Sequence, residues 1–203
     1  MNLLAIESSS RKLSIGLKKE AKITKLFSDK INDSANSLPV LSKKIIKDAS
    51  LSFQDLDAIC ISSGPGSFTG LRVGMSYAKG IALALNIPVI PISTFDILAY
   101  NNSTSLSVVI FSHGNTFYVC DYNIKNKKLF KSGLAKSILK EDLLNLKTKI
   151  IFNGPDRIFK NLKSQKLEIE FANLSIENLL QIALNNFKLL KTKSLDLSLI
   201  HIS

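Results

Sequence analysis

Residues 56–86 constrain the fold more than any other stretch, because a strand, a glycine-rich loop and a long helix follow one another without a break. Ile59 and Ile61 flank Cys60 in a short apolar run, which is typical of a buried strand. Residues 64–66 read Gly-Pro-Gly, and a proline between two glycines ends a strand in a tight turn. The stretch therefore predicts a strand–turn–helix unit of an α/β protein.

The helix of this unit has recognisable ends. Ser67 or Thr69 caps its first turn. The helix runs to about Asn86, because Pro88 forces the preceding residue out of the α region. Small residues recur every four positions along the helix and form one stripe, consisting of Gly70, Gly74, Ala78 and Ala82.

This small-residue stripe predicts a close approach by another segment, because two glycines inside a helix each cost about 1 kcal/mol relative to alanine. That segment belongs either to the protein's own sheet or helices, or to a helix of a partner protein seated in the groove. In the second case, Leu71, Met75 and Lys79 beside the stripe would supply further contacts. Spacing alone favours internal packing.

The loop and helix also suggest phosphate binding, since helix N-termini attract anions. The motifs match poorly. A Walker A loop needs Lys-Ser or Lys-Thr after its last glycine, but Leu71 and Arg72 follow Gly70. The dinucleotide fingerprint needs its third glycine where Thr69 stands. The loop by itself is therefore a weak indication of nucleotide binding.

The formal net charge of +11 would suit a nucleic-acid partner. However, only Arg11, Arg72 and Arg157 are arginines, and the other basic residues are lysines. Nucleic-acid surfaces favour arginine for bidentate contacts. The densest lysine runs lie at 125–131 and 188–193. The composition favours a solvated lysine-rich surface over a dedicated nucleic-acid face, and leaves a weak electrostatic contribution to RNA binding open.

Cysteine and histidine usage argues against a metal site and against a catalytic dyad. Cys60 and Cys120 lie in apolar strand-like runs and are predicted to be buried, reduced thiols of a cytoplasmic protein. His113 and His201 are the only two histidines, so no paired-histidine metal motif exists. The first apolar run ends at Ile6 with no basic segment before it, and no apolar stretch is long enough to span a membrane.

The first half of the chain reads as a sheet followed by alternating helices and strands. Three strands come first, at residues 2–7, 12–18 and 21–28. A helix over 33–50 carries Leu38 and Leu41 on its apolar stripe. After the strand–turn–helix unit, a strand at 89–92 and a brief helix ending at Tyr100 complete this half.

The polar run 101–105 marks the boundary between two halves, predicted as lobes 1–100 and 101–203. The second half repeats the order of the first, with strands at 106–111, 116–122 and 128–131, a helix at 139–146, a strand at 149–153, a helix at 156–163, a strand at 167–171 and a helix at 176–190. Two β-β-β-α-β-α units in series predict the actin-like fold, an α/β architecture shared by sugar kinases, Hsp70 and actin.

Two segments resemble the TsaB (YeaZ) family, namely residues 1–9, MNLLAIESS, and residues 62–79, SSGPGSFTGLRVGMSYAK. The resemblance implies an actin-like, non-catalytic subunit of the machinery that makes threonylcarbamoyladenosine in tRNA. Its implied partners are a TsaD-type catalytic subunit that holds the metal, a TsaE-type ATPase, and tRNA reached through the complex. The modified base would be the adenosine next to the anticodon in tRNAs that read codons beginning with A.

The resemblance also implies roles for individual residues. It favours a partner helix on the stripe, and so an interface that comprises Leu38, Leu41, Gly70, Leu71, Gly74, Met75, Ala78, Lys79 and Ala82. It implies a vestigial phosphate loop that comprises Glu7, Ser8, Ser9, Gly64 and Gly66. Arg11 stands where TsaD-type proteins have an aspartate, so no catalytic residue, no metal and weak or no nucleotide binding are expected of the isolated chain.

The chain departs from the TsaB pattern at 35–39, at 112–114 and at 197–203, and the last two departures put TsaE contacts in doubt. Other functions stay open. One is an ATP-binding actin-like phosphotransferase that acts on its own through loops at 8–10 and at Gly114. Another is a module that binds tRNA directly. In the absence of its partner, an exposed stripe would also let the chain pair with a second copy.

Overall fold

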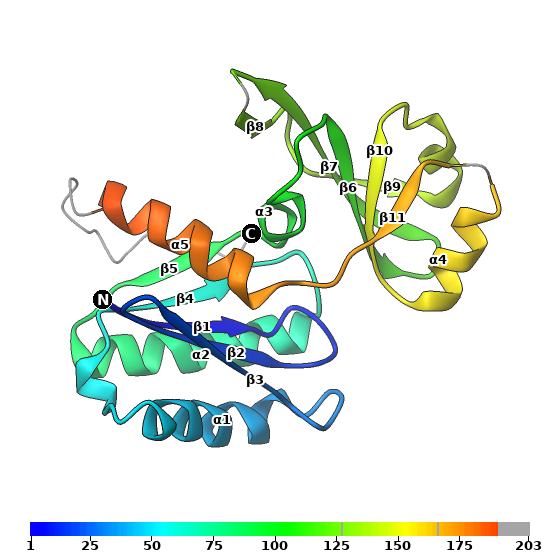
Figure 1. Cartoon of the computed structure of the whole chain (residues 1–203). Helices are drawn as coiled ribbons and strands as arrows, with labels where there is room; N and C mark the ends of the chain where they lie inside the picture. The colour runs from blue at the N-terminus through cyan, green and yellow to red at the C-terminus, as the bar shows by residue number, and fades with distance from the viewer. Residues whose placement is uncertain (127, 166, 191–203) are drawn as a thin grey trace. The chain divides into compact units, whose positions relative to one another are not determined.

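The computed structural model of the chain describes residues 1–126, 128–165 and 167–190, and Figure 1 follows them from one end to the other. The predicted tail at 194–203, the departure at 197–203, His201 and the lysines beyond Leu190 lie outside this part. The chain divides into two compact units. The first comprises Met1–Ser93 together with the chain from Ile176, and the second comprises Thr94–Ser175.

The first unit is built on a five-stranded sheet with the order β3-β2-β1-β4-β5. Its strands are β1 (Asn2–Glu7), β2 (Ser14–Lys19), β3 (Lys22–Phe27), β4 (Ala58–Ser62) and β5 (Val89–Ile92). β1, β2 and β3 pair antiparallel, whereas β1, β4 and β5 pair parallel. β4 is buried along its whole length and β1 is buried from its second residue, as expected of apolar strands covered on both faces.

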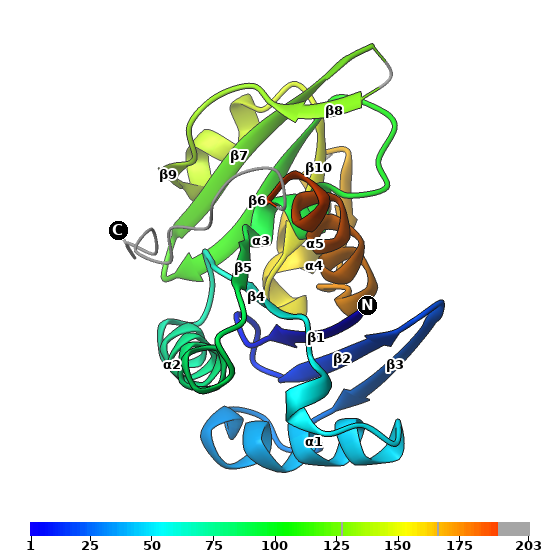
Figure 2. The ribbon, with the colours of Figure 1, turned by 90° about the vertical axis from the view of Figure 1, so that its left-hand side faces the viewer.

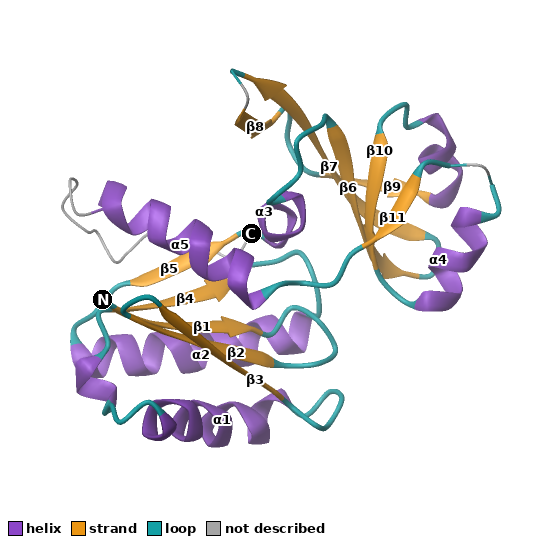
Figure 3. Ribbon diagram, viewed as in Figure 1, coloured by secondary structure: helices purple, strands orange, loops and turns teal. Residues whose placement is uncertain are grey.

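Helices cover both faces of this sheet (Figures 1 and 3). α1 (Ser34–Asp48) and α2 (Phe68–Leu85) lie side by side on one face, and α5 (Ile176–Leu190) lies on the other (Figure 2). α2 has the predicted ends, because the Ser67 side chain accepts a hydrogen bond from Gly70 N and Asn86 takes the left-handed conformation after the last turn. A short 3₁₀ helix (Phe53–Asp55) precedes β4.

The second unit has a six-stranded sheet with the order β11-β10-β6-β7-β8, and β9 pairs with β7 beside β8. Its strands are β6 (Leu106–His113), β7 (Thr116–Lys125), β8 (Lys128–Lys131), β9 (Lys136–Leu139), β10 (Lys149–Asn153) and β11 (Ile169–Phe171). Its helices are α3 (Thr94–Ala99), α4 (Asp156–Lys163) and a 3₁₀ helix (Lys140–Asn145). That 3₁₀ helix stands where the sequence predicts an α-helix over 139–146, and β9 was not predicted.

The two sheets repeat one topology. In each, the third, second and first strands of the unit lie in that order, and two parallel strands follow beyond the first strand. This repeat confirms the predicted pair of β-β-β-α-β-α units and the actin-like α/β fold.

The boundaries of the units differ from the predicted halves at 1–100 and 101–203, because the last helix of each half packs in the other unit. Phe95 and Leu98 of α3 belong to the apolar core around β6 and β7. α5 instead packs against β1, β2, β4 and β5, and its Leu179 and Leu180 are completely buried. An apolar helix face is buried on whichever sheet its loop can reach, and sequence order alone does not decide which one.

A partly buried hydrogen bond joins α3 to the sheet of the second unit. The Tyr122 hydroxyl on β7 donates to Asp96 Oδ1 at 2.6 Å, and Lys131 Nζ lies 3.1 Å from Asp96 Oδ2. Burial of the Tyr122 ring and its bond to the carboxylate both raise the pKa of the hydroxyl. The folded unit therefore favours the neutral, proton-donating form of Tyr122.

We expect Tyr122→Phe to lower the free energy of unfolding by about 1–2 kcal/mol at neutral pH, because the carboxylate of Asp96 loses a donor. The Tyr122 hydroxyl contributes this stability fully below the pKa of a tyrosine in the unfolded chain, about 10. The contribution is lost as the pH rises through the higher pKa that Tyr122 has in the folded unit. Urea titrations at pH 7 and pH 10.5 should show the wild type losing part of its advantage over Tyr122→Phe at the higher pH. A constant difference at both values would contradict this assignment.

Candidate functional site

The loops after β1 and β4 meet at the carboxyl ends of these two parallel strands. Ser67 N donates to the Ser9 carbonyl at 2.6 Å, and a Cβ atom on Gly66 would lie closer than 3.0 Å to that same carbonyl oxygen. Gly64 takes a positive φ of 98° between β4 and α2, a conformation that side chains other than glycine rarely adopt. The structure thus brings together the two predicted parts of the vestigial phosphate loop.

Glu7 fills the inside of the turn after β1. Its side chain is 1% exposed, and its Oε1 accepts hydrogen bonds from Ser9 N at 2.7 Å and Ser9 Oγ at 2.6 Å. Ser10 Oγ donates to Oε2 at 2.7 Å, and Ser62 Oγ on β4 lies 3.4 Å from Oε1. The donors that a phosphate would need at this turn are therefore bonded to the chain's own carboxylate.

The glycines of α2 face this turn. A Cβ atom on Gly70 would lie closer than 3.0 Å to the Ser8 carbonyl oxygen, and one on Gly74 would lie equally close to Ser8 Oγ and 3.2 Å from a methyl group of Ile61. Distances under 3.0 Å, like those to the two Ser8 oxygens, are essentially never observed for real Cβ atoms. The glycines are thus needed because the turn of the same subunit passes directly over the helix.

This packing corrects the interface expected on the small-residue stripe. Six of the nine expected interface residues are buried in the first unit, namely Leu38, Gly70, Gly74, Met75, Ala78 and Ala82. Leu41 and Leu71 are half-buried, and Lys79 is exposed. Internal packing therefore accounts for the stripe, and the six buried residues are not available to a partner of the folded unit.

The opposite side of α2 is exposed, and we call it the outer helix face, consisting of Thr69, Arg72, Ser76, Lys79, Gly80 and Leu83. Leu83 is 84% exposed, and a Cβ atom on Gly80 would meet no other atom within 4 Å. Ser76, Gly80 and Ala84 form a second series of small residues spaced by four, and all three are exposed. The sequence carries this second series, but the interface expected from the resemblance used only the first stripe.

α1 extends this surface at the side of α2. Val40 is 65% exposed, and Lys43, Lys44 and Lys47 are also exposed on the same helix. Near the start of α1, a shallow groove of about 320 Å³ runs between the helix and the end of β3, lined in part by Phe27, Val40 and Leu41. The exposed sides of α1 and α2 thus offer apolar side chains within a basic surrounding.

Comparison with known proteins identifies the family. Residues 31–194 match the family model of TsaD, tRNA N6-adenosine threonylcarbamoyltransferase. The chain is 30% identical over 165 residues to the tRNA threonylcarbamoyladenosine biosynthesis protein TsaB of Bacillus subtilis, which covers 77% of this chain and 72% of that protein. The chain belongs to the TsaB family.

Two further comparisons agree with this family. The crystal structure of YeaZ from Pseudomonas aeruginosa superposes with a TM-score of 0.76 and covers 98% of both chains at 21% identity, which shows a shared fold. A tRNA N6-adenosine threonylcarbamoyltransferase from Gluconobacter oxydans is 43% identical over 58 residues, 29% of this chain and 16% of that enzyme. The TsaB family and the TsaD-type enzymes are thus related, and this TsaB-family chain has a role in tRNA threonylcarbamoyladenosine biosynthesis.

The remaining candidate groups of this TsaB-family chain are structural or isolated. Cys60 and Cys120 are buried free thiols, as predicted, and burial raises the pKa of both. His113 lies exposed at the end of β6, where Ser112 Oγ is 3.0 Å from its Nδ1. Within the described residues, no three His, Cys, Asp or Glu side chains are grouped so that they could hold a metal ion, and no helix is long and apolar enough to cross a membrane.

Two alanine substitutions in α2 should have opposite effects on stability. Alanine favours a helix interior over glycine by about 1 kcal/mol, so Gly80→Ala should raise the free energy of unfolding by up to that amount. Gly70→Ala should lower it by about 1–3 kcal/mol, since the added methyl group would overlap the Ser8 carbonyl. Chemical denaturation of the two variants and the wild type tests this, and a stabilised Gly70→Ala protein would contradict the close packing.

Proposed function

We propose that this chain is a non-catalytic scaffold subunit that pairs with a TsaD-type protein and so supports threonylcarbamoyl transfer to tRNA. The contact would be made by the exposed sides of α1 and α2. The observation that carries the proposal is the outer helix face, where the highly exposed Leu83 lies beside the open surface at Gly80.

The outer helix face has the properties of a helix-packing surface. Ser76 and Gly80 have small side chains or none, which lets a second helix approach closely. Leu83 would lose its contact with water on association, and burial of a leucine side chain contributes about 1.5–3 kcal/mol. Arg72 and Lys79 are exposed on this face and α2 contains no acidic residue, so acidic residues on the partner would complement it.

A TsaD-type partner fits this surface because the two families are related. The TsaD family model spans residues 31–194, and therefore both α1 and α2. A TsaD-type protein is thus expected to carry a similar pair of helices. Two related helix pairs can associate about an approximate two-fold axis, each presenting the same face to the other. The same geometry would let this chain form a homodimer when the partner is absent.

The absence of catalysis by this chain is supported by its residues. Only two histidines occur in the whole sequence, and one of them, His113, lies in the described part, where no three His, Cys, Asp or Glu side chains are grouped so that they could hold a metal ion. Glu7 is bonded to its own turn. Threonylcarbamoyl transfer, and any metal that polarises the transferred group, would then belong to the partner. Contact with a TsaE-type ATPase and a cytoplasmic location stay predictions.

The alternative function, an ATP-binding phosphotransferase that acts alone, is disfavoured by the turn after β1. A phosphate there would have to displace the Glu7 carboxylate from the Ser9 and Ser10 donors, and the two negative charges would repel each other. The loop at Gly114 is open to solvent, because a Cβ atom added to Gly114 would meet no other atom within 4 Å.

We expect Gly80→Gln to weaken the complex with the TsaD-type protein of the same cell at least about tenfold, because the longer side chain would keep the partner helix away. The position is open, so the subunit itself should stay folded. Gly133→Gln is the matched control, since a side chain there also meets nothing within 4 Å and lies in the second unit. Isothermal titration calorimetry with the purified partner measures the dissociation constant.

Circular dichroism confirms that each variant is folded before the affinities are compared. Equal affinity of the wild type and the Gly80→Gln variant would refute the assignment of the outer helix face. Failure of the wild type to bind any TsaD-type protein would refute the proposed function itself. Light scattering of the isolated chain adds a second measurement, since Gly80→Gln should also convert a homodimer to a monomer.

We expect no saturable binding of Mg-ATP by the isolated chain at up to millimolar concentration, because Glu7 uses the donors of the turn. Titration calorimetry at pH 7 tests this. Tight binding of Mg-ATP that Glu7→Gln strengthens would instead show that the turn is a working phosphate site, and would favour the phosphotransferase.

A further inference from the structure

The segment 122–140 is the most one-sidedly charged part of the chain. It contains six lysines and no aspartate or glutamate, whereas the whole chain carries 27 basic and 16 acidic residues. The lysines are Lys125, Lys127, Lys128, Lys131, Lys136 and Lys140. Its first part contains the end of β7 and the whole of β8, which pair antiparallel (Figure 1).

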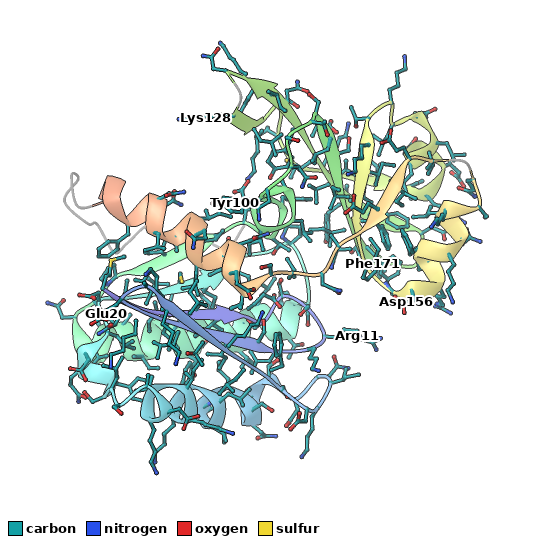
Figure 4. The ribbon with its side chains drawn as sticks, in the orientation of Figure 1. Arg11, Glu20, Tyr100, Lys128, Asp156 and Phe171 are labelled. Atoms are coloured by element: carbon teal, nitrogen blue, oxygen red, sulfur yellow. The ribbon has the colours of Figure 1, made fainter. Side chains whose placement is uncertain are left out.

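The strand register gathers four of its exposed side chains on one face. Lys125 pairs with Lys128, and Asn123 pairs with Phe130. Directly opposed residues and residues two apart share a face of the sheet, so these four form what we call the hairpin face. All four are exposed, and Phe130, which is 43% exposed, lies opposite Asn123 and two residues from Lys128 on β8. Figure 4 shows Lys128 at the outer end of the hairpin.

The other face of the hairpin is used for packing. Tyr122 is buried against α3, Leu129 packs on the same core, and Lys131 pairs with Asp96. On the hairpin face, by contrast, no carboxylate among the described residues lies within ion-pair distance of Lys125 or Lys128. Phe130 belongs to neither apolar core described for the second unit. Like charges directly opposed across a strand pair are destabilising, so folding does not explain this arrangement.

We infer that the hairpin face binds the tRNA that the complex modifies. Ammonium groups at Lys125 and Lys128 would contact backbone phosphates, and Phe130 beside Lys128 would stack on an unpaired base. Asn123 on the same face supplies donors and an acceptor to a base edge or a ribose hydroxyl. The inference rests on the proposed function, which brings tRNA to the complex, and adds a contact made by this chain.

The test uses the complex of this chain with its TsaD-type partner and an unmodified tRNA transcript. Lys125→Gln/Lys128→Gln should lower the affinity for tRNA at least about tenfold at 0.1 M salt and reduce the slope of log affinity against log salt by nearly two. Lys160→Gln/Lys163→Gln on α4 removes the same charge from the same unit and should leave both quantities near those of the wild type.

The role of Phe130 gives a second, independent signature. Phe130→Leu keeps an apolar side chain but removes the aromatic plane, and should weaken tRNA binding about tenfold without changing the salt slope. A stacking contact differs in this way from a phosphate contact, because it releases no counterions.

The outcomes separate this inference from the proposed function. If the complex forms and the hairpin variants bind tRNA like the wild type, the hairpin inference is overturned while the scaffold role stands. If the complex does not form, the proposed function fails first.

The same hairpin variants are tested on phosphatidylserine vesicles, and a loss of vesicle binding with unchanged tRNA binding would assign the hairpin face to a membrane surface instead. Equal losses in the α4 control would show a general charge effect and also overturn it.

Discussion

The first unit depends on the close approach of the turn after β1 to the backbone of α2. Gly70 and Gly74 remove the side chains that would hold the turn away, and Ser67 N binds the Ser9 carbonyl at 2.6 Å. Glu7 holds the turn in shape from inside through the serine donors. One short loop is thereby fixed between a central strand and a long helix, so the position of α2 on the sheet is determined by backbone contacts as well as by its apolar side chains.

That approach decides which side of α2 is left for a partner. A helix has one face toward its sheet, and the face that carries Gly70 and Gly74 is already occupied. The outer helix face, about half a turn away, keeps Gly80 and Leu83 in solvent next to the exposed side of α1. Because Glu7 accepts the hydrogen bonds of Ser9 and Ser10, the turn that fixes α2 is stabilised by groups of the chain itself.

The sequence predicted most of the fold because periodicity and turn residues act locally. β1, β4, β5 and the ends of α2 follow from apolar runs, from Ser67 and from Pro88. Periodicity shows which residues of a helix share a face, but it does not show whether that face meets its own sheet or a partner. The spacing of the stripe favoured internal packing, and the family resemblance moved the stripe to a partner interface, where the burial of its residues contradicts it. The unit boundary was missed because α3 and α5 each pack away from the sheet that precedes them in the chain.

The lysine-rich composition is the reason that the sequence alone did not indicate the hairpin face. When most basic residues are lysines spread along the chain, their number says little about any one surface. Strand register adds the missing information, because it places Lys125 opposite Lys128 and puts Phe130 on the same face as both. Compositional drift toward lysine explains an excess of positive charge. It does not explain an exposed aromatic ring next to two opposed lysines on the face of the hairpin that is turned away from the core. A bound polyanion with planar bases accounts for both features at once.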